Sequence, residues 1–146
     1  MKKISVALCL FVLLTVAAVA QTPAKPSLYK RLGGYDAIAA VSDDFLGRLA
    51  ADKQLARFLT GRSEDNMKKL RQNFVDQICA VTGGPCVYIG RDMKTTHKGM
   101  GITEADWTAA VNDLVATLDK FKVQGDERAE LLAAVSSLKK DVVEKP

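Results

Sequence analysis

Apolar residues recur every three or four positions along most of this chain, which is the spacing of helices that pack one face against a core. Met67, Leu70, Phe74 and Ile78 follow this rule in one stretch. No stretch alternates polar and apolar residues as a half-buried strand does. The pattern predicts helices over residues 35–51, 64–81, 92–98, 103–121 and 126–143, with a short connection over 52–60. We therefore expect an all-α domain without internal repeats.

Glycine and proline separate the predicted helices. Gly83-Gly84-Pro85 ends the helix that precedes it, because neither residue type continues a helix well. Gly90, Gly99 and Gly101 leave room for only one short helix in the next segment. Thr103-Glu104-Ala105-Asp106 has the pattern of a capping box, in which side chains accept the free backbone N–H groups of a first helical turn.

The first 20 residues have the pattern of an export signal. Lys2-Lys3 is followed by the apolar, uncharged run Ile4–Ala20, and Ala18-Val19-Ala20 fits a cleavage site before Gln21. An uncleaved anchor is the alternative, because the run reaches the lower length limit of a membrane-spanning helix. We expect a periplasmic or secreted protein, away from the membrane unless the leader is retained. Residues 21–28 would then form a disordered leader, and residues 29–143 the folded domain.

Length and charge restrict the function. The chain has 146 residues and a formal net charge of +4. Without Lys2 and Lys3, the chain has 19 basic and 17 acidic residues. A chain of this length builds one domain with a real core. Its charge is too balanced to indicate nucleic-acid binding.

Two cysteines remain outside the export signal. Cys79 and Cys86 are close in sequence and are separated by the Gly-Gly-Pro turn. Export would place them in an oxidising compartment, where a disulfide persists. Two small, buried, unlinked thiols are the alternative.

The chain contains a single histidine, His97. A zinc site needs three or four protein ligands, so one imidazole cannot build the usual kind. A haem needs only one axial ligand from the protein, because the porphyrin supplies four nitrogens. Met93 lies four residues earlier and would share a helical face with His97. The count therefore leaves a haem protein open, beside the alternative of a histidine that binds nothing.

Several motifs follow one another along the chain. They are Tyr29-Lys30-Arg31-Leu32-Gly33-Gly34, Ala37-Ile38, Val41-Ser42-Asp43-Asp44-Phe45, Thr82-Gly83-Gly84-Pro85 and Tyr88-x-Gly90-x-x-Met93-x-x-x-His97-x-Gly99. Together they resemble the truncated haemoglobins of group I, over essentially residues 29–143. The resemblance implies a two-over-two helical sandwich that holds one haem b per chain, with His97 as the proximal ligand of a pentacoordinate iron. A diatomic gas (O2, NO or CO) would bind on the opposite, distal side.

The resemblance also assigns residues to the surroundings of the haem. Met93 would pack under the porphyrin, where a thioether fits well, and Trp107 would form a proximal wall. Tyr88 and Lys69 are candidates for contacting the haem propionates, because an anion near the mouth of a pocket favours a hydroxyl or a cation. Arg71 is a weaker candidate for the same contact.

The distal side departs from the usual pattern of this family. Leu46 stands where a tyrosine is usual, and Leu59 follows Phe58 where a second phenylalanine is expected to pack on the haem. The positions that face the gas ligand correspond to Leu70 and Phe74. None of these side chains donates a hydrogen bond.

A distal pocket without donors changes ligand preference. A hydrogen bond to the partly charged outer oxygen of dioxygen is worth roughly 1.5–3 kcal/mol. We expect a largely apolar pocket that binds CO and NO better, relative to dioxygen, than a typical member does. Asn73 and Gln77 lie close enough in sequence that either one can reach in.

Three functions are compatible with these residues. A carrier, scavenger or sensor component that binds a gas reversibly is favoured over an enzyme. A haem-dependent NO dioxygenase would need a reductase partner, and a peroxidase would need a distal acid–base group, for which no second histidine exists. Leu59 leaves open a third reading, a haem-free helical domain that binds a partner.

Overall fold

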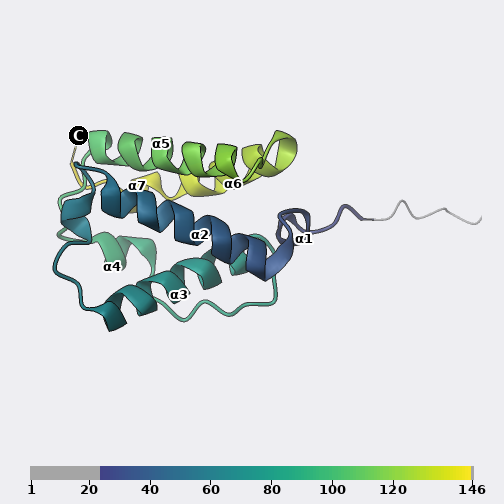
Figure 1. Cartoon of the computed structure of the whole chain (residues 1–146), viewed down its shortest axis with the longest axis horizontal. Helices are drawn as coiled ribbons and strands as arrows, with labels where there is room; N and C mark the ends of the chain where they lie inside the picture. Colours follow the sequence, from purple (N-terminus) through teal and green to yellow (C-terminus); the bar gives the residue numbers. More distant parts are fainter. Residues whose placement is uncertain (1–23, 146) are drawn as a thin grey trace, which may run out of the picture.

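The computed structural model describes residues 24–145, and all of its regular elements in this range are helices (Figure 1). The expected export signal, residues 1–20, lies outside the described residues. The elements are α1 (Leu28–Arg31), α2 (Gly34–Ala51), the 3-10 helix η1 (Ala56–Phe58), α3 (Glu64–Val81), α4 (Met93–His97), α5 (Glu104–Lys120), α6 (Gly125–Ser137) and α7 (Lys139–Val142). Among residues 24–145, none of the helices is long and apolar enough to span a membrane.

The helices form two layers around α2. α2 packs most extensively on α3 and on α5, and Figure 1 shows α5 and α6 on one side of it and α3 and α4 on the other. The central buried cluster consists of Phe45 of α2, Leu114 and Leu118 of α5, and Leu131 of α6. The ring of Phe74 from α3 lies 5.5 Å from that of Phe45, between ring centroids. The predicted all-α, two-over-two arrangement is confirmed.

Most helix ends follow the local sequence signals. α2 and α3 begin and end within one residue of the predicted bounds. Ser63 accepts a hydrogen bond from the N–H of Asn66 at the start of α3. The capping box predicted at Thr103 is present, with Asp106 as its other member.

The C-terminal helix differs from the prediction. The single helix expected over 126–143 is divided into α6 and α7 at Leu138. The apolar spacing continues through Leu138 and Val142, and both line a central cavity, so periodicity gave no sign of the break. α7 packs against α4. That tertiary contact is the reason the chain redirects here.

The segment before α2 is held against α6. Lys25 pairs with Asp126 and Glu130, and Arg31 pairs with Glu127 at 2.8 Å as well as with Glu130. These ion pairs tie Lys25 and Arg31 to α6, and the disordered leader expected over 21–28 stays a prediction. The partners of Lys25 lie about a hundred positions away in sequence, so no local pattern indicated this contact.

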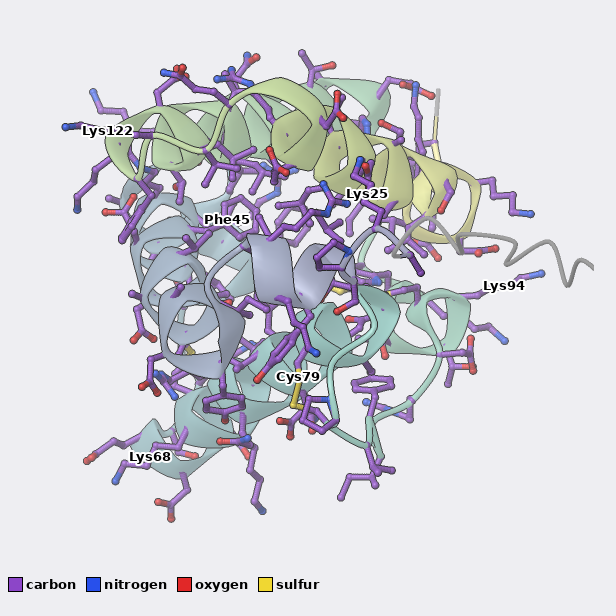
Figure 2. The ribbon with its side chains drawn as sticks, turned by 90° about the vertical axis from the view of Figure 1, so that its right-hand side faces the viewer. Lys25, Phe45, Lys68, Cys79, Lys94 and Lys122 are labelled. Carbon is purple, nitrogen blue, oxygen red and sulfur yellow. A yellow bond between two sulfur atoms is a disulfide. The ribbon has the colours of Figure 1, made fainter. Side chains whose placement is uncertain are left out.

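A disulfide joins the end of α3 to the loop that leads to α4. Cys79 and Cys86 are bonded, with their Cα atoms 5.8 Å apart (Figure 2). Cys79 is fully buried. The open choice between a disulfide and two free thiols is thus settled in favour of the disulfide.

A half-buried carboxylate with three hydrogen-bond donors makes the contact between α2 and α5 sensitive to acid. Asp44 accepts hydrogen bonds from Lys120, from Arg48 at 2.8 Å and from Thr117 at 3.1 Å. These contacts lower the pKa of Asp44 from 3.8 to about 2. Because the pKa is lower in the folded state, the stabilisation is present above about pH 4 and is lost as the pH falls through about 2.

Asp44→Asn is therefore expected to reduce the free energy of unfolding by about 1–2 kcal/mol at neutral pH. It should also flatten the decline in stability between about pH 4 and pH 2. Urea titrations at several pH values measure both effects. Asp36→Asn, on the exposed side of α2 and without an ion pair among residues 24–145, is the control. Equal losses in the two variants would contradict the role of the network.

Candidate functional site

A cavity of about 460 Å³ lies between the two helical layers. Its walls come from α2, η1, α3, α4, α5, α6 and α7 and are mostly apolar. The volume falls within the range of small-molecule and cofactor sites. The predicted site residues that line it are Leu46, Leu59, Leu70, Phe74, Tyr88, Met93, His97 and Trp107.

Two predicted cations lie elsewhere. Lys69 is exposed and is not among the lining residues, so its contact with a propionate stays a prediction for the outer rim. Arg71 pairs with Asp43 of α2, at 2.5 and 2.8 Å, and does not line the cavity. Asp43 raises the pKa of Arg71 through these hydrogen bonds.

Arg62 is a lining residue that the sequence analysis missed. Its Nε donates to the carbonyl of Phe58 at 3.2 Å, which holds the side chain beside the η1 segment. The sequence feature that could have indicated this residue is its position four residues after Phe58, which was already expected near the haem. An arginine here can pair with an anionic group at the cavity mouth.

His97 is the last residue of α4, and its ring orientation is fixed within that helix. Asp92 caps the start of the helix, because its carboxylate accepts the N–H of Thr95 at 2.8 Å. Nδ1 of His97 lies 2.8 Å from the carbonyl of Met93. A carbonyl only accepts, so Nδ1–H is the donor and Nε2 of the neutral ring carries the free lone pair. Lys94 of the same helix points away from the body of the molecule (Figure 2). Nε2 is therefore the ring nitrogen that is available as a ligand, and the His97 side chain lines the apolar cavity.

Tyr88 is held against the wall by the residues that follow it. Its hydroxyl donates to the carbonyl of Arg91 at 2.6 Å. A Cβ at position 90 would lie 2.4 Å from the tyrosine ring, so only glycine allows this packing. Burial raises the pKa of Tyr88. The hydroxyl proton of Tyr88 is already donated to the carbonyl of Arg91. Tyr88 would have to break that hydrogen bond before it could donate to a haem propionate.

The wall that α3 contributes is one helical stripe. Each lining position lies three or four residues from another one, which places them on one face of the helix. They are Leu70, Asn73, Phe74, Gln77, Ile78 and Val81. Asn73 and Gln77 thus belong to the cavity wall, where they are the two amide side chains. The rest of this wall is apolar, and Leu46 and Leu59 add further apolar side chains to the lining.

A buried aspartate anchors η1 to the start of α5. Asp106 is 2% exposed and accepts hydrogen bonds from Arg57 at 2.7 Å, from Gln54 at 2.8 Å and from Thr103. Burial by itself would raise the pKa of Asp106, but these hydrogen bonds outweigh it and lower the pKa. The segment that carries Phe58 is therefore fixed relative to Trp107, one residue after Asp106 on α5.

Comparison with known proteins decides the family. The bacterial-like globin family matches residues 27–144. The group 1 truncated haemoglobin of Mycolicibacterium paratuberculosis is 34% identical over 80% of this chain and 83% of its own length. The chain belongs to the group 1 truncated haemoglobins.

Solved structures of this globin group agree with the fold. The truncated haemoglobin of Tetrahymena pyriformis, in its Fe(III) form, superposes with a TM-score of 0.75, at 27% identity, and covers 82% of this chain and 100% of that one. The 2/2 haemoglobin of a Synechococcus species, described in the cyanomet state with covalently attached haem, has a TM-score of 0.72 at 30% identity. It covers 81% of this globin and 98% of its own chain.

The residues of this globin fit a haem. A porphyrin needs an apolar slot, one axial ligand and a polar edge for its carboxylates. The cavity supplies apolar walls from both layers, and His97 supplies a nitrogen with a free lone pair. Arg62 supplies a cation in the lining.

Proposed function

We propose that this globin is an exported protein that binds one haem b per chain and reversibly binds a diatomic gas at a pentacoordinate iron. The observation that carries the proposal is the geometry of His97. Its Nδ1 is occupied by the Met93 carbonyl, and its side chain lines an apolar cavity. When bound, the haem supplies an iron with one open coordination position, which is where such a gas binds.

The residues of the chain divide into a proximal and a distal set. On the proximal side, Met93 and Trp107 line the same cavity as His97 and would form its apolar surroundings. On the distal side, Leu46, Leu59 and Phe74 enclose the space for the gas without offering a donor. Arg62 is in place to pair with a propionate at the edge.

This distal wall supports a preference among gases. Dioxygen gains more from a distal hydrogen bond than CO or NO does, because more charge develops on its outer oxygen. Most of the wall is apolar, and its two amides, Asn73 and Gln77, come from α3, where Asn73 is exposed and Gln77 is half-buried. We infer that CO and NO bind relatively better than dioxygen.

Two features support export of this globin. The chain begins with a charged and then apolar run that has a small-residue cleavage pattern. The disulfide between Cys79 and Cys86 is of the kind that persists in an oxidising compartment.

Removal of the imidazole tests the haem proposal. Protein reconstituted with hemin should show a Soret band distinct from that of free hemin, and His97→Ala should weaken or shift it. Loss of an axial ligand should speed haem loss at least tenfold, since even outer-shell partners of such ligands are worth roughly 10–100-fold in affinity. Transfer of haem to an acceptor protein measures that rate. Lys94→Ala, exposed on the same helix, is the matched control.

A different result would favour the haem-free alternative. If the wild type, His97→Ala and Lys94→Ala all give the spectrum of free hemin, the cavity does not hold haem through His97. The scaffold would then be a helical domain that binds another partner.

A further inference from the structure

Glu144 joins the C-terminal segment to the turn that follows His97. Its two carboxylate oxygens accept the N–H groups of Gly99 and Gly101, each at 2.6 Å. Its own N–H donates to the carbonyl of Ile102 at 2.8 Å, and the N–H of Lys145 donates to the same carbonyl at 3.1 Å. Two consecutive residues thus bind the whole turn from residue 99 to residue 102.

The turn is shaped to receive a carboxylate. Gly99 and Gly101 have φ values of 82° and 65°, a region that other residues rarely adopt. Backbone N–H groups that converge in this way form a concavity that binds anions. The pKa of Glu144 is lowered by the N–H groups of Gly99 and Gly101. Glu144 therefore stays ionised and bound to the turn at neutral pH.

The helix that carries His97 depends on contacts of this kind. α4 has five residues, and a helix of that length is not stable by itself. The Asp92 carboxylate holds its first turn, and Glu144 holds the chain directly beyond its last residue. The ring of His97 is hydrogen-bonded to the Met93 carbonyl inside the same helix, so a shift of α4 moves the ring as well.

Glu144 itself is not among the residues that line the cavity. It therefore acts on the site only through the backbone of residues 99–102, of which Met100 and Ile102 do line the cavity. α7, which immediately precedes this segment, packs against α4 and places Glu144 beside the turn.

We propose that Glu144 is a positioning residue for His97: its carboxylate fixes the turn at Gly99–Gly101 and thereby the orientation of the imidazole in the cavity. This inference rests on the proposed role of His97 as the axial ligand. It adds a residue outside the cavity that sets how the imidazole meets the iron.

The test uses Glu144→Ala and Glu144→Gln in the haem-loaded protein. The readout is the Fe–His stretching band of the ferrous form in resonance Raman spectra, which reports the geometry of the axial bond. In Glu144→Ala the band should shift and broaden, and haem loss should become roughly three- to tenfold faster, as expected for the loss of one or two exposed hydrogen bonds. Glu144→Gln keeps one acceptor oxygen and should give an intermediate result.

Glu104→Ala is the matched control. The Glu104 carboxylate pairs with Lys139 at 2.6 Å, so it also ties α7 to the body without touching the turn. Its band should stay at the wild-type position. An unchanged band in folded Glu144→Ala, or an equal shift in Glu104→Ala, would overturn the proposal.

A second measurement separates this proposal from that of haem binding. In the haem-free protein, NMR signals of the Gly99 and Gly101 amides should lie far downfield and should move upfield in Glu144→Ala. Hydrogen exchange in residues 93–97 should become faster at the same time. The amide signals can shift in Glu144→Ala even if hemin fails to bind through His97. In that case the proposed function fails, but the role of Glu144 in fixing the turn after α4 stands. If the Gly99 and Gly101 amide signals and the exchange rates do not change, the proposed role of Glu144 is refuted.

Discussion

Replacing Leu46 with tyrosine is expected to slow the dissociation of dioxygen ten- to a hundredfold, which corresponds to the roughly 1.5–3 kcal/mol of a hydrogen bond to a charged acceptor. Leu46 is buried on α2 and lines the cavity together with the α3 stripe. A phenolic hydroxyl at this position would place a donor on the α2 wall, in addition to the amides of Asn73 and Gln77 on α3. Stopped-flow replacement of dioxygen by CO measures the rate.

Leu46→Phe is the control for this substitution. It adds the same ring without the hydroxyl, so it reproduces any effect of crowding in the pocket. The dissociation rate of CO should change little between the phenylalanine and tyrosine variants. If both variants slow dioxygen equally, volume and not hydrogen bonding controls dissociation. If neither does, an amide of α3 already supplies the donor.

Removing the disulfide is expected to lower the free energy of unfolding by about 2–3 kcal/mol, the value that chain entropy gives for a short closed loop. Cys79 and Cys86 are seven positions apart, and Cys79 is fully buried. Alanine at both positions avoids burying a hydroxyl at residue 79. Urea unfolding of the double variant and of the wild type measures the difference.

A thiol reductant provides the control for the disulfide prediction. It should lower the stability of the wild type toward that of the variant and leave the Cys79→Ala, Cys86→Ala protein unchanged. A reductant effect of equal size on both proteins would show that the loss has another origin. A double variant as stable as the oxidised wild type would show that the bond contributes nothing to folding.

The long helices could be predicted from the sequence because their signals are local. Spacing of three and four residues identified α2, α3 and α5, and the Thr103–Asp106 pattern identified the start of α5. The same spacing failed at Leu138, where α7 turns to contact α4, because apolar residues occur on both sides of the break. Short α1 was missed since Ser27 and the ion pairs of Arg31 hold it, not an apolar stripe.

The site could be predicted in part, for a similar reason. His97 and seven other predicted residues line the cavity, because the resemblance to the globins placed them along the chain. Arg62 was missed, and Lys69 and Arg71 do not line the cavity, because the direction of a long cationic side chain depends on partners such as Asp43. Glu144 was missed because it acts on residues more than forty positions away, through their backbone.

If this globin binds haem and gas as proposed, the stripe on α3 separates gas selectivity from haem retention in the primary structure. One face of a single helix, from Leu70 to Val81, lines the cavity where the gas would bind, while the imidazole and its hydrogen-bond partner occur after residue 87. Substitutions confined to that face can retune which gas is preferred and leave the attachment of the cofactor intact. Natural variants, or a library in which only residues 70, 73, 74 and 77 are randomised, can therefore change the gas preference while the residues that would hold the haem stay the same.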